Sequence, residues 1–250
     1  MQGRWDSPDL SALHLLGESM KSGHKVSIGV CDPGTVNGDF AFRLVQLAQS
    51  RSSRLGPFVR IKGSGLLSKL RNRVVKAFLD NTDSDWLLMI DCDEQLTLQA
   101  FDQLINTAHD KERPVVAGLV FAAFKADENL YPQPIPTIFQ DAPEGFLPLF
   151  KYDRNAIFEI DACGTGCILI HRSVLEKMRE TADPHQGADW CWFWDGPLNG
   201  TWISEDLLFS RRIRQLGFPI HVNTAAILPH QKTYWLDERH HIAWQLNENS

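Results

Sequence analysis

The stretch WLLMIDCD, residues 86–93, decides the fold of this chain. Its first five residues are all apolar, which is typical of a strand buried on both faces of a parallel sheet. Two carboxylates, Asp91 and Asp93, follow directly after this predicted strand. Because open α/β sheets bind their ligands beyond the carboxyl ends of the strands, the stretch also predicts where a functional site lies.

Apolar runs alternate with helical patterns on both sides of residues 86–90. Short apolar runs predict strands over 26–31, 58–61 and 115–120. Apolar side chains at helical spacing predict helices over 39–49, 67–78 and 96–108. This alternation is typical of an open, doubly wound α/β sheet.

The second half of the chain has a different composition. Prolines crowd the stretch after Phe124, which predicts an irregular or hairpin-like segment. Beyond it we predict strands over 157–161 and 167–171 and helices over 174–179 and 205–216. Ser204 is expected to cap the last of these helices, and Gly217 and Pro219 are expected to end it.

Composition and charge exclude several classes of protein. The 250 residues are 43% hydrophobic and 22% charged, which argues against disorder, collagen and coiled coil. The net charge of −6 argues against a protein that coats nucleic acid by bulk charge. Residues 40–79 nevertheless contain nine lysines and arginines and no acidic residue. That segment predicts a surface for an anion, and a solvated helix face is the alternative.

Cysteine usage and hydropathy predict a soluble, cytoplasmic protein. Five cysteines, with only one C-x3-C pair, favour reduced thiols over a disulfide framework or a zinc site. The first 16 residues lack the pattern of a secretory signal, and no apolar stretch approaches the ~18 residues of a membrane span.

The carboxylates of Asp91 and Asp93 predict a metal site. Hard oxygen ligands on a short loop suit Mg2+ or Mn2+, which keep coordination positions open for a substrate's phosphates. An Asp-rich turn that caps the helix beginning near Thr97 is the alternative.

Four stretches together resemble glycosyltransferases of the GT-A fold, in particular family-2-like enzymes, including those of phage type. WLLMIDCDEQL resembles their D-x-D segment, and LRNR at 70–73 resembles their A-R-N element. DACGTGCILI at 161–170 resembles the glycine-bearing strand and turn, and SEDLLFSRR at 204–212 resembles the x-E-D motif. The resemblance spans residues 25–231. It implies a Rossmann-like open mixed sheet flanked by helices, in a single domain with a smaller acceptor-side subregion.

The resemblance divides the chain and assigns the metal site. It implies a nucleotide-binding half over 25–124 and an acceptor-side half over 125–250, and it leaves 1–24 unassigned. Asp93 is implied as a metal ligand, Asp91 as a contact to the ribose or the metal shell, and His230 as the third ligand. A surface histidine after a proline is the alternative for His230.

The resemblance also implies donor contacts. Asp32 corresponds to a contact to the nucleotide base, Arg71 to a group that neutralises the diphosphate, and Asn72 to a contact to the base or ribose. Ordinary polarity of a helix surface is the alternative for Asn72. Gly164 and Gly166 permit close approach of the backbone to a sugar, or simply form a tight turn.

Asp206 is the implied general base, and the adjacent Glu205 is expected to position the acceptor or the sugar. Acidic residues in a first helical turn also interact favourably with the helix dipole, which is the alternative for both. Residues 189–202 contain four tryptophans, among them Trp194, and resemble the acceptor-side lid. A satellite hydrophobic cluster is the alternative for this segment.

These implications converge on a metal-dependent glycosyltransferase. It would transfer a sugar from a nucleotide diphosphate, with UDP favoured, to a hydroxyl with inversion. A hydroxymethylated DNA base is one expected acceptor, which would place the protein in the host cytoplasm if it is phage-encoded, and a protein or small glycan is the alternative. Retention of configuration, a nucleotidyltransferase and a non-catalytic nucleotide-sugar-binding module also remain open. A processive polysaccharide synthase is not expected, because Q-x-x-R-W and membrane helices are missing.

Overall fold

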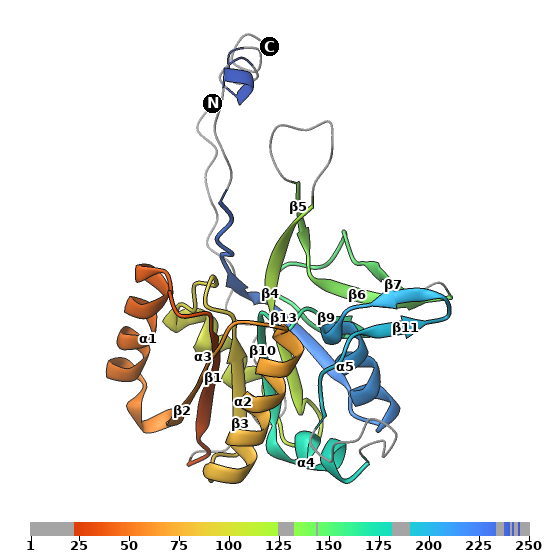
Figure 1. Ribbon diagram of the computed structural model, residues 1–250. Helices are drawn as coiled ribbons and strands as arrows, with labels where there is room; N and C mark the ends of the chain where they lie inside the picture. The colour runs from red at the N-terminus through yellow and green to blue at the C-terminus, as the bar shows by residue number, and fades with distance from the viewer. Residues whose placement is uncertain are drawn as a thin grey trace.

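The computed structural model describes residues 23–124, 133–143, 145–181, 191–233, 238–240, 242 and 245. An eight-stranded mixed sheet forms its centre, and helices cover both faces (Figure 1). The predicted fold class, an open mixed α/β sheet flanked by helices in a single domain, is therefore confirmed.

The first half alternates strands and helices as predicted. Its elements are β1 (Val26–Asp32), α1 (Gly38–Ser50), the short helix η2 (Ser52–Arg54), β2 (Leu55–Lys62), α2 (Leu67–Asn81), β3 (Trp86–Ile90), α3 (Leu98–Thr107) and β4 (Val115–Phe124). β1 pairs in parallel with both β2 and β3. The carboxyl ends of these three strands therefore meet at one edge of the sheet.

Strands from the second half complete the same sheet. The order is β2-β1-β3-β10-β4-β13-β8, and β5 (Gln133–Pro136) pairs with β4. β10 (Cys167–His171) is antiparallel to both β3 and β4, which it separates. β13 (Ile220–Leu228) runs parallel to β4, and β8 (Ile157–Ile160) is antiparallel to β13. The sheet is therefore mixed because the returning chain inserts a strand at its centre.

The apolar run of β3 is explained by its two buried faces. Leu87 and Met89 belong to one core cluster, which also contains apolar residues of α2, α4 and α5. Trp86, Leu88 and Ile90 belong to a second cluster, with residues of α1 and α3. Alternate side chains of a strand point to opposite faces, so a strand covered on both sides needs five apolar residues in a row.

Smaller elements make up the rest of the second half of the chain. They are the three-stranded sheet of β6 (Ile138–Ala142), β7 (Gly145–Pro148) and β9 (Ala162–Cys163), the hairpin of β11 (Gly196–Leu198) and β12 (Thr201–Ile203), and the helices α4 (Arg172–Glu180) and α5 (Glu205–Gln215). In Figure 1 the small sheet and the hairpin lie to one side of the main sheet.

The helix α5 begins and ends close to its predicted bounds. Gly217 follows it with a φ of 85°, a conformation that glycine adopts at little cost. Ser204 occupies the N-cap position, but its predicted capping hydrogen bond is wrong. Its hydroxyl donates to the carboxylate of Asp206 instead of accepting from a backbone N–H.

All five cysteines are free thiols, as predicted. Within the described ranges, we find no helix that has both the length and the apolar character needed to cross a membrane.

Candidate active site

The loop after β3 is held from two sides. The backbone N–H of Asp91 donates to the carbonyl of Gly166 at 2.9 Å, next to the start of β10. On the other side, Gln95 N–H donates to Pro229 O at 2.9 Å and Gln231 N–H donates to Asp93 O at 2.8 Å. The segment after β13 is thereby joined to the D-x-D loop.

These two backbone hydrogen bonds place His230 against Asp93. Its Nε2 is 2.9 Å from Asp93 Oδ2, and its Nδ1 is 2.8 Å from the carbonyl oxygen of Phe121. The hydrogen bond with His230 holds the pKa of Asp93 below its usual range, and the same bond raises the pKa of His230. Both were predicted as ligands of one metal ion, and their side chains lie close enough to share an ion.

Glu94 belongs to the same group, and the sequence analysis missed it. Its side chain is 1% exposed, and neither carboxylate oxygen has a hydrogen-bond partner among the described residues. Burial raises the pKa of Glu94 to about 8. One ligand atom each from Asp93, Glu94 and His230 lies within 4.8 Å of the others. The position of Glu94 directly after D-x-D could have indicated its role, but an acidic residue at this position is also typical of a turn.

The donor set of this group fits a divalent cation. His230 Nδ1 faces only acceptors, since Phe121 O lies at 2.8 Å and Glu94 Oε1 at 3.3 Å. Nδ1 therefore carries a proton, and Nε2 directs either a lone pair or a second proton at Asp93. A carboxylate buried without a hydrogen bond is costly, and a bound cation would lower the cost that the contact with His230 leaves. Oxygen and imidazole ligands both suit Mn2+.

The alternative interpretation of the D-x-D loop as a helix cap is not supported. The N-cap of α3 is Thr97, whose own hydroxyl accepts from Ala100 N–H at 3.0 Å. Asp91 and Asp93 are therefore not needed to cap this helix.

Asp91 is not part of this group and pairs with Arg71. The Arg71 guanidinium is 4% exposed; its Nη2 donates to Asp91 Oδ2 at 3.0 Å and its Nη1 to Glu205 Oε1 at 2.6 Å. Burial raises the pKa of Glu205, and the charge of Arg71 opposes that rise. Arg71 was predicted to neutralise a diphosphate, but here it joins α2, the loop after β3 and the start of α5.

Asp206 lies at the start of α5 beside Glu205. Its Oδ1 accepts from the Ser204 hydroxyl and from Leu207 N–H at 2.9 Å. Its Oδ2 has no hydrogen-bond partner in the described part of the chain. One oxygen thus fixes the carboxylate, and the other is available to accept a proton.

The side-chain amide of Asn72 forms hydrogen bonds to the backbone of residues 192–193. Its Oδ1 accepts from the N–H groups of Trp192 and Phe193 at 2.7 and 2.8 Å, and its Nδ2 donates to Phe193 O at 2.7 Å. The predicted contact to a base or ribose does not match this geometry, because the buried amide holds the backbone of 192–193.

Asp32 lies at the end of β1, buried and next to a cavity. Gly34 N–H and the Arg60 guanidinium each donate to one of its two oxygens. Both bonds lower the pKa of Asp32, and the bond from Gly34 has the larger effect. A cavity of about 270 Å³, lined also by Val36, Phe40 and Phe58, opens beside it. The cavity is lined by residues of β1, β2 and α1 and of the connection between β1 and α1.

The two predicted glycines pack tightly. A Cβ on Gly166 would lie 3.1 Å from Glu94 Oε1 and 3.6 Å from Asp91 Oδ2. A Cβ on Gly164 would lie 3.0 Å from Cβ of Thr137. Gly166 therefore leaves room beside the acidic loop, whereas Gly164 packs against a neighbouring strand connection.

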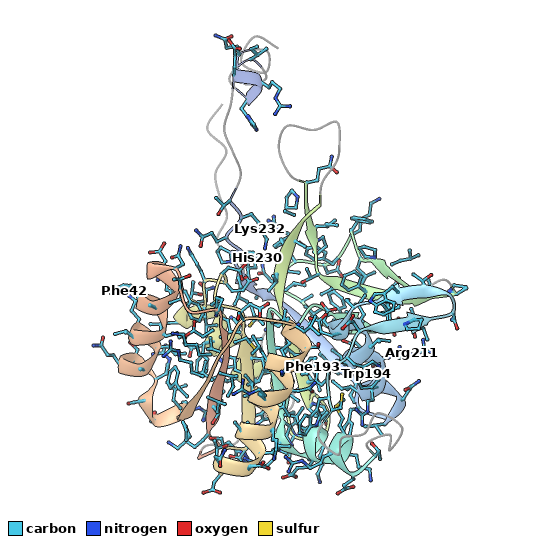
Figure 2. All side chains as sticks on the ribbon, in the orientation of Figure 1. Phe42, Phe193, Trp194, Arg211, His230 and Lys232 are labelled. Carbon is cyan, nitrogen blue, oxygen red and sulfur yellow. The ribbon has the colours of Figure 1, made fainter. Side chains whose placement is uncertain are left out.

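The tryptophan-rich segment is divided between the core and the surface, where Trp202 is 68% exposed. Trp192 and Phe193 are buried in the first core cluster. The guanidinium of Arg212 lies 5.2 Å from the ring centre of Trp194. Figure 2 shows Trp194 well away from His230, so the structure does not bring it to the cation group. Residues 189 and 190 lie outside the described residues.

The basic segment does not form a uniform cationic surface. Arg51, Arg60, Arg71 and Lys76 are each paired with an acidic residue. The cations of the segment that lack an acidic partner in the described ranges are Arg43, Arg54, Lys62, Lys69 and Arg73. The segment's anion-binding potential is therefore about half of what its composition predicts.

The solved structures compared with this chain below are distant likenesses. No protein-family model matches the chain, and no curated protein matches it. Among solved structures, A197 from STIV is 16% identical with a TM-score of 0.49, over 87% of this chain and 99% of that one. GalNAc-T7 with UDP, GalNAc and Mn2+ is 12% identical with a TM-score of 0.48, over 85% of this chain and 44% of that one. Likenesses at this level carry no functional conclusion.

Proposed function

We propose that this protein is a metal-dependent glycosyltransferase of the GT-A type. The observation that carries the proposal is the convergence of Asp93, Glu94 and His230 within 4.8 Å at the carboxyl end of β3. The second support is the acidic start of α5, which Arg71 ties to the same loop. The proposed donor is a UDP-sugar, and the proposed metal is Mn2+ or Mg2+.

The cation would be held by Asp93 and His230, with Glu94 beside them. When bound, it supplies positive charge that stabilises the leaving diphosphate. Glu94 is supported as part of this site by its burial and by its lack of a hydrogen-bond partner in the described residues. Gly166 contributes by leaving space for the carboxylates of Glu94 and Asp91.

Arg71 would orient the acidic loop rather than bind the donor. Its buried guanidinium fixes the carboxylates of Asp91 and Glu205 at 3.0 and 2.6 Å. With one face of Asp91 held by Arg71, its position at the strand end suits the proposed contact to the ribose. The cavity beside Asp32, with Phe40 and Phe58 in its lining, suits the flat apolar face of a nucleotide base.

Asp206 is proposed as the general base of an inverting transfer. The acceptor oxygen forms a bond to the anomeric carbon while the bond from that carbon to the diphosphate breaks. The acceptor proton passes to Asp206 Oδ2, and the nucleoside diphosphate leaves with the bonding electron pair. Oδ1 stays fixed by Ser204 and Leu207, so proton transfer does not need the carboxylate to rotate.

The acceptor is proposed only as a hydroxyl group. A hydroxymethylated DNA base has less support than the composition of residues 40–79 indicated, because four of its nine cations are paired internally. A protein or small glycan is the alternative acceptor. We propose action in the cytoplasm, and the five free thiols agree with a reducing compartment.

The proposal is tested first by thermal stabilisation. UDP, GDP, CMP and ADP are added to the full chain, each with Mn2+ and with a chelator. A shift for UDP that requires Mn2+ and is lost in Asp93→Asn supports the proposal. Asp83→Asn is the matched control, because this exposed carboxylate precedes β3 at the opposite end of the strand. No shift with any nucleotide would overturn the proposed function.

A second measurement separates an enzyme from a non-catalytic nucleotide-sugar-binding module. UDP-sugars are incubated with the chain and Mn2+, with and without acceptors, and release of UDP is measured. Release that Asp206→Asn abolishes while nucleotide binding persists supports catalysis. Binding without any release, across acceptors that include hydroxymethylated DNA, glycans and protein, would favour the binding module.

A further inference from the structure

A lysine lies at the open side of the proposed cation site. The Nζ atom of Lys232 contacts Nε2 of His230 and lies 3.4 Å from Oδ2 of Asp93. Figure 2 shows His230 and Lys232 next to each other above the main sheet. The hydrogen bond from Gln231 N–H to Asp93 O holds the intervening backbone against the loop.

The surroundings of this ammonium are those that a metal ion would have. His230 Nδ1 faces Phe121 O and Glu94, so Nε2 directs its lone pair outward when the ring is neutral. Asp93 Oδ2 lies 2.9 Å from that nitrogen. Two acceptors at this separation need a cation or a proton between or beside them, and the Lys232 ammonium supplies the positive charge.

An ammonium and a divalent ion cannot both occupy this position. Both would use Oδ2 of Asp93 and Nε2 of His230, and like charges at contact distance repel. The Lys232 side chain is 41% exposed, and its four-carbon stem has free rotation. Its ammonium can therefore move into solvent when another cation takes its place.

We propose that Lys232 is a resident cation that occupies the metal position and must be displaced when a divalent ion binds. The inference rests on the metal site of the proposed function and adds a competitor to it. Lys232 then stabilises the loop without metal and weakens the affinity for metal. Metal affinity is thus set by a residue that is not itself a ligand.

The first test measures Mn2+ binding to the full chain in the absence of nucleotide. Free Mn2+ is followed by its electron paramagnetic resonance signal in Lys232→Met and in the wild type. We expect Lys232→Met to bind Mn2+ about fivefold more tightly, the factor that corresponds to the upper end of an exposed ion pair. Lys111→Met is the matched control, because Lys111 is exposed between α3 and β4 and is expected to leave Mn2+ affinity unchanged.

Two outcomes would contradict the inference, and they are distinguishable. Equal affinities, or weaker binding by Lys232→Met, would overturn the competition and leave the metal site standing. No Mn2+ binding by either protein would overturn the competition together with the metal part of the proposed function.

The second test uses a chelator, so that no divalent ion is present. Melting temperatures are compared for Asp93→Asn, Lys232→Met and the double variant. If the ammonium rests on Asp93, the double variant loses less than the sum of the two single losses. Strictly additive losses would overturn the contact and the inference with it.

Discussion

The buried Arg71 and the partly buried Glu205 form an ion pair with an Nη1–Oε1 distance of 2.6 Å, although they lie 134 positions apart in the chain. The same guanidinium donates from Nη2 to both oxygens of Asp91, at 3.2 and 3.0 Å. Two carboxylates that different parts of the chain bring together thereby share one positive charge. The relative position of the D-x-D loop and of the start of α5 depends on this shared charge.

Arg71→Gln is therefore expected to destabilise the protein strongly. Removal of one partner of a buried pair typically costs about 3–5 kcal/mol, and the partial exposure of the Asp91 and Glu205 side chains places the expected loss at the lower end of that range. Glu205→Gln should cost less, because Asp91 still pairs with Arg71. The free energies of unfolding of the two variants, measured in urea, check both expectations. Arg73→Gln is the control, since Arg73 is exposed on the same helix and has no acidic partner in the described residues. Equal losses in Arg71→Gln and Arg73→Gln would contradict the central role of the pair.

Asp206→Asn is expected to reduce turnover while donor binding persists. Loss of a general base typically lowers the rate by about 10²–10⁴-fold. The amide oxygen of asparagine can still accept from Ser204 and Leu207, so the start of α5 should be preserved. Turnover with a UDP-sugar and the Kd for UDP are measured on the same preparation, with Asp83→Asn as the control. Unchanged turnover would rule out Asp206 as the base.

Helices and strands that are marked by a pattern within their own residues could be predicted from the sequence. β3 was predicted over the same five residues that the structure assigns, because a strand buried on both faces needs an unbroken apolar run. The helix α5 was predicted to within one residue, because its acidic first turn and Gly217 mark its ends.

Features that depend on distant parts of the chain could not be predicted in the same way. The insertion of β10 between β3 and β4 is set by long-range pairing, which no local pattern reports. Glu94 is buried because the segment carrying His230 lies against the loop. Trp192 was grouped with a lid because aromatic content alone does not say whether a ring faces the core or solvent.

Asn72 and Arg71 show that the sequence does not identify the hydrogen-bond partners of a candidate site residue. Both were predicted as donor contacts from their place before the D-x-D strand, and both are buried polar groups with partners inside the protein. Buried polar groups need hydrogen-bond partners. The sequence identifies such a group, but only the fold decides whether its partner is a ligand or another part of the chain.

The stability of the protein is expected to fall as the pH drops below about 6.5. Burial lowers the pKa of His171. The folded protein then binds fewer protons than the unfolded chain, so stability is present above the unfolded pKa and is lost as the pH falls toward the folded one. The Nδ1 atom of His171 also accepts from Ser173 N–H at the start of α4, which requires the neutral ring.

His171→Asn isolates this contribution, because asparagine can cap a helix but does not titrate in this range. Melting temperatures from pH 7.5 to 5 should fall less steeply in the variant than in the wild type. Burial also lowers the pKa of His221, so part of the wild-type slope should remain. Parallel curves for the two proteins would contradict the role of His171.

Glu94→Gln is expected to change stability in opposite directions with and without metal. In chelator, the substitution removes a buried carboxylate that has no hydrogen-bond partner among the described residues, so the melting temperature should rise by a few degrees. With Mn2+, the wild type gains the favourable interaction of that carboxylate with the ion, and the variant does not. The affinity for Mn2+ should fall by about 10–100-fold, as for other groups that support a metal ligand.

The opposite changes in stability with and without metal distinguish a role of Glu94 in cation binding from a purely structural role. A residue that only packs would change the melting temperature by the same amount in chelator and in Mn2+. Glu112→Gln provides the matched control, because the Glu112 side chain is 62% exposed and its substitution should leave both melting temperatures nearly unchanged. If Glu94→Gln lowers stability equally under both conditions, Glu94 does not serve the cation, and the group reduces to Asp93 and His230. Two protein ligands would then have to bind the ion together with the donor's phosphates, which predicts that Mn2+ binds only when UDP is present.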